Sequence, residues 1–283
     1  DGGFEDIQFA IGNQWDAAAR AERERQGRPC LTFDRLSPAV KQVTGEIRKN
    51  KPAITITPGD GAATPETAKV MEGLCRAIER ASGAQRIYVM AAEQACIYGQ
   101  GHFRLSYEWA DYESFEQELR VNPVPNPLSV VWDRESVRDD RSDAKRCFVY
   151  AELTKKEYEK AYPKAAPGSW DKAQPYAAQP QIGNRAQDVV TVCEYWKVEP
   201  HHFWIYQMRH IASGAVQTLL NPQAEEIQQY EAAGWVYVQR RMAEKPRIVM
   251  YLLSSANEVL SGPIEWIGSR IPIFPVQGEI THV

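Results

Sequence analysis

Two periods of hydrophobic and polar residues run along the chain, and the longer period predicts helices. The helical period is clearest over residues 64–82. Thr64 can cap the first turn, Pro65 fits the first helical position, and Gly83 suits a left-handed stop. The face that we expect to be buried comprises Val70, Met71, Leu74, Ile78 and Ala81.

Shorter helices are predicted elsewhere. Ser37 is a candidate N-cap for a helix that ends at Asn50 and carries Val40, Val43 and Ile47 on one face. A helix over 86–98 contains the small residues Ala91, Ala92 and Ala95. Another begins at the capping box of Thr154 and ends at Pro163, and a third runs from Asn221 to Gly234.

The shorter period predicts strands. Over residues 102–109, Phe103, Leu105, Tyr107 and Trp109 alternate with polar residues. Further strands are expected at 53–57, 115–121, 130–132, 147–153 and 188–198, the last continued by Trp204 and Tyr206. Residues 235–241 and 246–253 are interpreted as a hairpin around Ala243-Glu244-Lys245, and the proline-containing segment 270–276 as an edge strand. The mixture predicts an α+β fold with helices packed on mixed or antiparallel strands.

Residues 163–187 carry several prolines and two glycines and show no hydrophobic period. We therefore expect an internal boundary or a long surface loop there. This divides the chain into 1–187, with an N-terminal helical part followed by strands, and 188–283, which is mainly β. The first residue is Asp1 instead of methionine, so we expect the sequence to continue in a longer protein.

Composition narrows the function classes. The 283 residues carry a formal net charge of −4, so the chain as a whole is not a basic nucleic-acid binder. No apolar run approaches the about 20 residues that a membrane-spanning helix needs. The cysteines lack a C-x-x-C pair, which predicts reduced, mostly buried thiols and an intracellular folding compartment; they are Cys30, Cys75, Cys96, Cys147 and Cys193.

An acidic cluster is the strongest candidate for chemistry. It comprises Asp133, Glu135, Asp139, Asp140 and Asp143, interleaved with Arg134, Arg138 and Arg141. The oxygen-ligand spacing of a calcium loop is absent, so we expect a solvated, salt-bridged loop. A metal-dependent hydrolase built on Asp133, Asp139 and Asp143 stays an alternative.

Other constellations predict no catalytic, cofactor-binding or metal-binding residue. His201 and His202 would point to opposite faces of a strand, and with His210 they lack cysteines at a zinc-ligand spacing. The lone G-x-G of residues 99–101 lies before a strand, the reverse of a dinucleotide fingerprint. Basic residues near aromatics are interpreted as surface side chains that pack their stems on apolar neighbours. They are Arg209 and, near Tyr237, Arg240 and Arg241.

Several motifs occur in one order along almost the whole chain. They are Gln14-Trp15, GRPCLTFDRL at 27–36, NKPAITITP at 50–58, Met71-Glu72-Gly73-Leu74, YGQGHFRLSYEW at 98–109, NPLSVVWD at 126–133, CEYWKV at 193–198 and IPIFPVQGE at 271–279. In this order they resemble the portal proteins of short-tailed (podovirus-type) tailed bacteriophages.

The resemblance implies a portal-type wing and a structural, non-enzymatic subunit without cofactors. The family forms a ring, a dodecamer, through which double-stranded DNA is packaged into and ejected from the capsid. Implied partners are the major capsid and scaffolding proteins, the terminase large subunit, tail or adaptor proteins and the DNA itself, with no membrane. The implied location is the portal vertex of the virion, after assembly in the host cytoplasm.

The stem, clip, crown and barrel of the family would not lie in this chain. A slightly acidic subunit suits a channel in which DNA must slide, because each neutralised phosphate strengthens binding. A second alternative beside the hydrolase is another virion adaptor protein.

Overall fold

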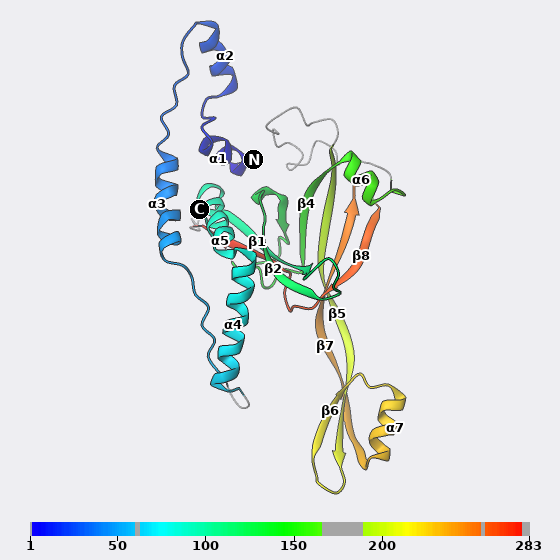
Figure 1. The fold of residues 1–283 in the computed structure, drawn as a ribbon. Helices are drawn as coiled ribbons and strands as arrows, with labels where there is room; N and C mark the ends of the chain where they lie inside the picture. Colours follow the sequence, from blue (N-terminus) through cyan, green and yellow to red (C-terminus); the bar gives the residue numbers. More distant parts are fainter. Residues whose placement is uncertain (1, 60–62, 166–188, 256–257, 279–283) are drawn as a thin grey trace.

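A computed structural model describes residues 2–59, 63–165, 189–255 and 258–278 (Figure 1). Helices fill the first part of the chain, ahead of the strands. They are α1 (Gly2–Ala10), α2 (Ala17–Arg25), α3 (Leu36–Lys49), α4 (Pro65–Ser82) and α5 (Ala84–Tyr98). With the antiparallel sheets below, they confirm the α+β class.

The ends of α4 follow the predicted local chemistry. The Thr64 hydroxyl accepts the Thr67 N–H at 3.2 Å, Pro65 begins the helix, and Gly83 closes it at φ 62°. A left-handed conformation at this stop favours glycine.

The start of α3 differs from the prediction, although its end at Asn50 is confirmed. Ser37 is not the N-cap, because the Asp34 carboxylate accepts the N–H groups of Leu36 and Ser37 at 3.0 Å each. The connection after α3 forms no strand over 53–57, because no neighbouring strand pairs with it in the described residues.

A three-stranded sheet packs against the helices. It contains β1 (Gln100–Trp109), β2 (Gln117–Pro123) and β9 (Ile273–Gln277) in the antiparallel order β2-β1-β9, which confirms the predicted edge strand. Helix α5 packs on β1, and its small residues Ala91 and Ala95 are buried. The approach is close, since a Cβ on Gly101 would lie 1.9 Å from the Ala91 carbonyl oxygen.

A larger antiparallel sheet has the order β3-β4-β5-β7-β8, with β6 paired to β5. Its elements in chain order are the short 3-10 helix η1 (Pro127–Ser129), β3 (Val130–Trp132), β4 (Arg146–Thr154), α6 (Lys155–Ala161), β5 (Val189–His210), β6 (Val216–Leu220), α7 (Ala224–Ala232), β7 (Trp235–Ser254) and β8 (Val259–Trp266). The predicted capping box is present, with Thr154 and Glu157 bonded reciprocally at the start of α6.

The predicted hairpin within 235–253 is wrong. Residues 243–245 continue one strand, because each of them pairs with a residue of β5, from Phe203↔Ala243 to His201↔Lys245. Strands β5 and β7 therefore run together out of the body of the molecule (Figure 1). We call residues 199–247, which include β6 and α7, the arm.

The main core lies where the two sheets meet. Its buried residues come from both sheets and their connections: Val124, Val130, Cys147, Val149, Trp196, Ile248, Ile271 and Ile273. Arg104 of β1 also donates to the Glu194 carboxylate of β5 at 2.9 Å. The predicted loop at 163–187 falls largely outside the described residues. The division at 187/188 stays a prediction, although β4 and β5, one from each side, pair in one sheet.

Candidate interaction surfaces

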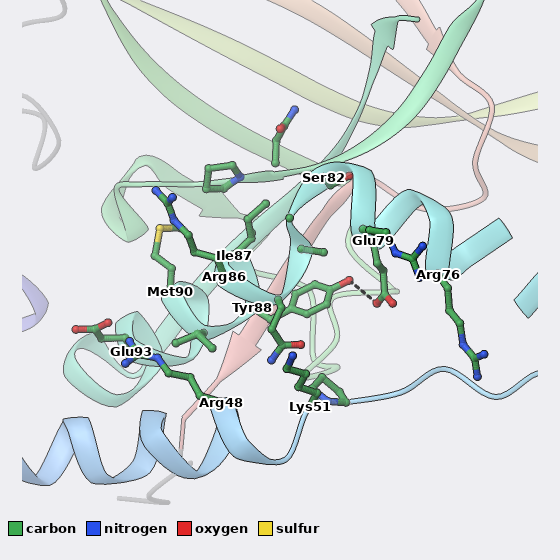
Figure 2. Close-up of a pocket in the computed structure, with 18 residues that line it drawn as sticks. Arg48, Lys51, Arg76, Glu79, Ser82, Arg86, Ile87, Tyr88, Met90 and Glu93 are labelled. Carbon is green, nitrogen blue, oxygen red and sulfur yellow. Dashed lines mark hydrogen bonds between the residues drawn. The ribbon is translucent and has the colours of Figure 1, made fainter. Parts of the chain in front are cut away.

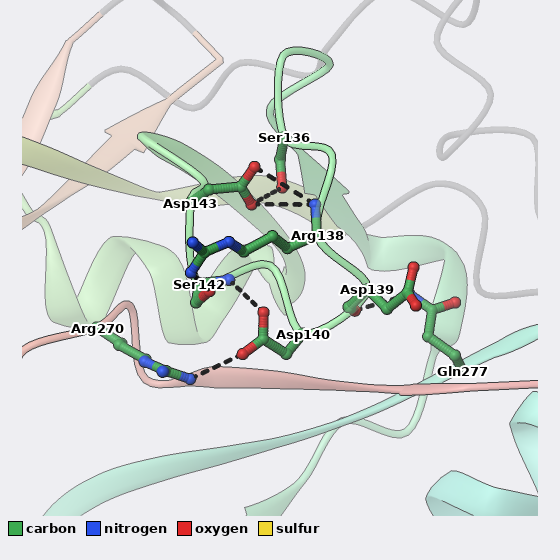
Figure 3. A network of polar contacts seen from close by, with 8 residues as sticks. All are labelled: Ser136, Arg138, Asp139, Asp140, Ser142, Asp143, Arg270 and Gln277. Atoms are coloured by element: carbon green, nitrogen blue, oxygen red, sulfur yellow. Dashed lines mark hydrogen bonds and ion pairs between the residues drawn. The ribbon is translucent and has the colours of Figure 1, made fainter.

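The acidic cluster forms a loop that is bonded to itself (Figure 3). Asp143 accepts the Ser136 hydroxyl at 2.7 Å and the Val137 N–H at 2.8 Å, and these bonds lower the pKa of its carboxyl to about 2. Asp140 accepts the Ser142 N–H at 3.1 Å, and hydrogen bonds from Ser142 lower its pKa as well.

The three carboxylates of the hydrolase hypothesis are not brought together. Asp133 accepts the Glu135 N–H at 3.2 Å, whereas the Asp139 main-chain carbonyl accepts the Gln277 amide at 3.1 Å. Among residues 2–59, 63–165, 189–255 and 258–278, no group of three His, Cys, Asp or Glu side chains could hold a metal ion. The loop geometry therefore supports a structural element.

The salt bridges of this loop differ from those expected. Arg138 donates to the Ser142 hydroxyl and Arg141 to the Ser136 carbonyl, at 3.1 and 2.9 Å. The cation that pairs with Asp140, at 3.0 Å, is Arg270 from the segment before β9. The loop is thereby attached to the far end of the chain, which the sequence pattern did not indicate.

The three candidate zinc histidines all lie in the arm, and each contacts a different residue. His202 faces Glu244 at 3.9 Å, His201 stacks on Phe203, and His210 bonds the Ser213 hydroxyl at 2.9 Å. Each histidine thus has a local partner of its own.

A hollow of about 1200 Å³ opens where α3 ends, between α4, the start of α5 and the end of β2 (Figure 2). Its charged side chains are mainly cationic, and its apolar lining includes Ile87, Val89 and Met90. Its cations are Arg48, Lys51, Arg76, Arg80 and Arg86, against the carboxylates Glu79 and Glu93. We call it the cationic hollow.

One carboxylate of this hollow is already engaged. The Tyr88 hydroxyl donates to Glu79 at 3.1 Å, and burial together with this carboxylate raises the pKa of Tyr88 to about 12. Of the five cations, Arg76 has an ion-pair partner, Glu72; the other four have none within 4.0 Å in the described residues. Sequence reasoning missed this site because its cations come from separate segments with no common motif.

The turn between β1 and β2 projects aromatic and acidic side chains into solvent. Tyr112 and Phe115 are fully exposed, and Trp109 is largely exposed. The turn is closed by the Ala110 N–H, which donates to the Glu116 carbonyl at 2.9 Å. We call residues 109–116 the acidic tip, since they also carry Asp111 and Glu113.

The expected buried face of α4 is open. Val70, Met71 and Leu74 are 70%, 46% and 52% exposed, and Ala81 is exposed too. Helix α4 packs on β2 and α5 near its C-terminal end, where Ile78 is partly buried. Contiguous exposed apolar side chains of this kind are typical of protein contacts.

The arm presents a further surface of mixed character. Val236, Val238 and Met242 are exposed along β7. The Arg240 guanidinium lies 4.8 Å from the Trp204 ring and donates to the Tyr206 hydroxyl at 3.1 Å. The predicted packing of basic side chains on aromatics is therefore confirmed for Arg240.

Two general expectations can be compared with the structure. No helix in the described ranges has the length and apolar character of a membrane span.

All five cysteines are free, but only Cys147 and Cys193 are buried, and Cys96 is exposed. The expectation of mostly buried thiols is therefore wrong.

The fold and its surfaces define an α+β protein whose candidate sites are contact surfaces. The sequence model of the phage P22-like portal protein family matches residues 3–283. The chain therefore belongs to the P22-like family of phage portal proteins. It is also 23% identical over 284 residues to a protein named "Portal protein" from Acyrthosiphon pisum secondary endosymbiont phage 1. The alignment covers 95% of this chain and 38% of that relative's length.

Proposed function

We propose that this chain is the wing of a portal ring subunit, with a structural and non-catalytic role. The observation that carries the proposal is the family match over residues 3–283. The exposed apolar faces of α4 and the arm support it, because a ring subunit needs contact surfaces toward two neighbours.

The ring, a dodecamer, forms the channel for packaging and ejection of double-stranded DNA at the portal vertex of the virion. Its partners are the major capsid and scaffolding proteins, the terminase large subunit and tail or adaptor proteins. Because the chain spans 38% of the curated relative, elements outside it would carry part of these contacts. The net charge of −4 suits a subunit that does not hold DNA tightly.

The test is assembly of the natural gene product that contains this chain. Native mass spectrometry and electron microscopy should show a closed ring with one defined subunit number. A protein that stays monomeric at all concentrations and salt conditions would contradict the proposal. Metal-dependent hydrolysis that is lost in Asp143→Asn would instead favour an enzyme.

A further inference from the structure

We propose that the acidic tip of one subunit inserts into the cationic hollow of its neighbour. This inference rests on the proposed ring and names the residues of one contact in it. The occupant of the hollow is thus a second copy of this chain, presented through Tyr112, Phe115 and the carboxylates beside them.

Charge complementarity is the first argument. Residues 105–119 contain no lysine or arginine, and Asp111, Glu113 and Glu116 lie in or next to the exposed turn. The hollow carries five cations against two carboxylates, and Glu79 is hydrogen-bonded to Tyr88. Opposite potentials on two patches steer and orient association.

Apolar complementarity is the second argument, and it favours a protein over nucleic acid. Tyr112 and Phe115 stand fully in solvent, where they contribute nothing to the core of their own subunit. The lining of the hollow includes Ile87 and Met90 as well as the cations. An aromatic side chain gains from this apolar lining, whereas a phosphate gains nothing from it.

The placement of the two patches makes the contact intermolecular. The tip lies at the Gln117 end of β2, and the hollow is lined by Asn122 and Pro123 at the other end. At about 3.4 Å per residue the two ends are roughly 20 Å apart, and antiparallel pairing with β1 keeps them so. A tip that cannot reach its own hollow is free to enter the hollow of another copy. Such a head-to-tail contact, when it is repeated, gives a ring where the rotation between copies closes.

The tip is also ordered in advance. Besides the closing bond from Ala110, the Glu116 N–H donates to the Ser114 hydroxyl at 2.9 Å, and the Tyr112 N–H donates to Asp111 at 2.6 Å. A preformed loop loses little conformational freedom on binding, so more of the contact free energy is retained.

The first experiment removes the aromatic side chains. Tyr112→Ser with Phe115→Ser is made in the natural gene product, and ring formation is measured by sedimentation and native mass spectrometry. At a concentration where the unaltered protein is half assembled, the ring population should fall at least about tenfold. The matched control is Phe33→Ser, an exposed aromatic outside both patches, which should leave assembly unchanged.

The second experiment reverses charges. Lys51→Glu with Arg86→Glu should lower the ring population similarly, and adding Glu113→Lys with Glu116→Lys should restore much of it. Circular dichroism and thermal unfolding verify that each variant is folded. The double reversal guards against misfolding, because a merely damaged hollow would not be rescued by changes in the tip.

The third experiment reads proximity directly. In a Cys96→Ser background, Phe115→Cys with Met90→Cys should give a ladder of disulfide-linked subunits on mild oxidation. Tyr237→Cys with Met90→Cys is the matched control and should give none.

The outcomes separate the two proposals. Rings that form normally in the tip variants, without a disulfide ladder, overturn the tip-and-hollow contact while the portal ring stands. Hollow variants that lose salt-dependent DNA binding but keep normal rings also overturn it, in favour of a nucleic-acid site. If the unaltered protein forms no ring, the portal ring and the contact within it are both wrong.

Discussion

Strands β5 and β7 form one continuous ladder whose two halves have opposite surroundings. In the inner half, Trp196 and Ile248 are buried in the core between the sheets, and Val192 is buried in a second cluster with Tyr158. In the outer half, the arm, Val236, Val238 and Met242 on the same strands are exposed. The backbone pairing is nevertheless uninterrupted apart from a shift in register at 207/208.

The difference shows that backbone pairing is sufficient to extend a strand, whereas the burial of apolar side chains determines which part of the strand is most stable. The inner half gains from apolar area removed from water. The outer half buries Met208 but keeps Val236, Val238 and Met242 available for other molecules. The following expectations test this contrast, from the largest effect to the smallest.

Truncating one aromatic side chain in each half should lower the free energy of unfolding by very different amounts. Trp196→Ala empties part of the inter-sheet core and should lower the free energy of unfolding by about 4 kcal/mol. Tyr237→Ala, on the arm, should change it by less than about 1 kcal/mol. Urea unfolding of both variants measures this. Equal losses would mean that the arm is as strongly stabilised as the body.

The body of the molecule should lose stability in acid through one buried histidine. Buried His102 accepts the Trp132 indole N–H at 3.1 Å, and burial, assisted by Arg141, lowers its pKa from 6.5 to about 4. Its neutral form therefore contributes full stability above the unfolded pKa near 6.5, and this is lost as pH falls through about 4.

The total loss from His102 should be about 3 kcal/mol. Unfolding free energies measured from neutral pH down to about pH 4 should fall less steeply in His102→Gln than in the unaltered protein. Val238→Thr, an exposed position of the arm without a titrating group, should keep the original slope. Identical slopes in all three proteins would refute the assignment to His102.

Ion pairs in the body and in the arm should also differ in coupling free energy, by a smaller amount. The partly buried Arg104–Glu194 pair, at 2.9 Å, joins the two sheets, whereas the His202–Glu244 pair of the arm is exposed and 3.9 Å apart. Double-mutant cycles should give a coupling of about 1 kcal/mol for the first pair and near zero for the second. A larger coupling in the arm would contradict the contrast.

Sequence reasoning worked where a local signal determines the local structure. The caps at Thr64 and Thr154 and the alternation of 102–109 predicted the start of α4, α6 and most of β1. Sequence reasoning failed where the structure of a segment depends on the strand that pairs with it. Residues 243–245 resemble a turn, yet β5 keeps them in a strand.

Most of the contact surfaces could not be predicted from the sequence. An amphipathic pattern on α4 predicts an apolar face but does not distinguish a core from a neighbouring molecule, so the burial of Val70 and Leu74 was predicted wrongly. The cationic hollow depends on how α3, α4 and α5 are placed relative to β2, which no local motif encodes. The acidic segment, in contrast, was correctly expected to be a loop, although its ion pair with Arg270 was not foreseen.

The arm has a mechanical consequence. Residues 199–210 of β5 extend over roughly 40 Å at about 3.4 Å per residue. A long two-stranded lever of this kind converts a tilt of a few degrees at its base into a displacement of several ångströms at its far end. Slight rocking of the body would therefore be transmitted to any molecule that contacts the end of the arm.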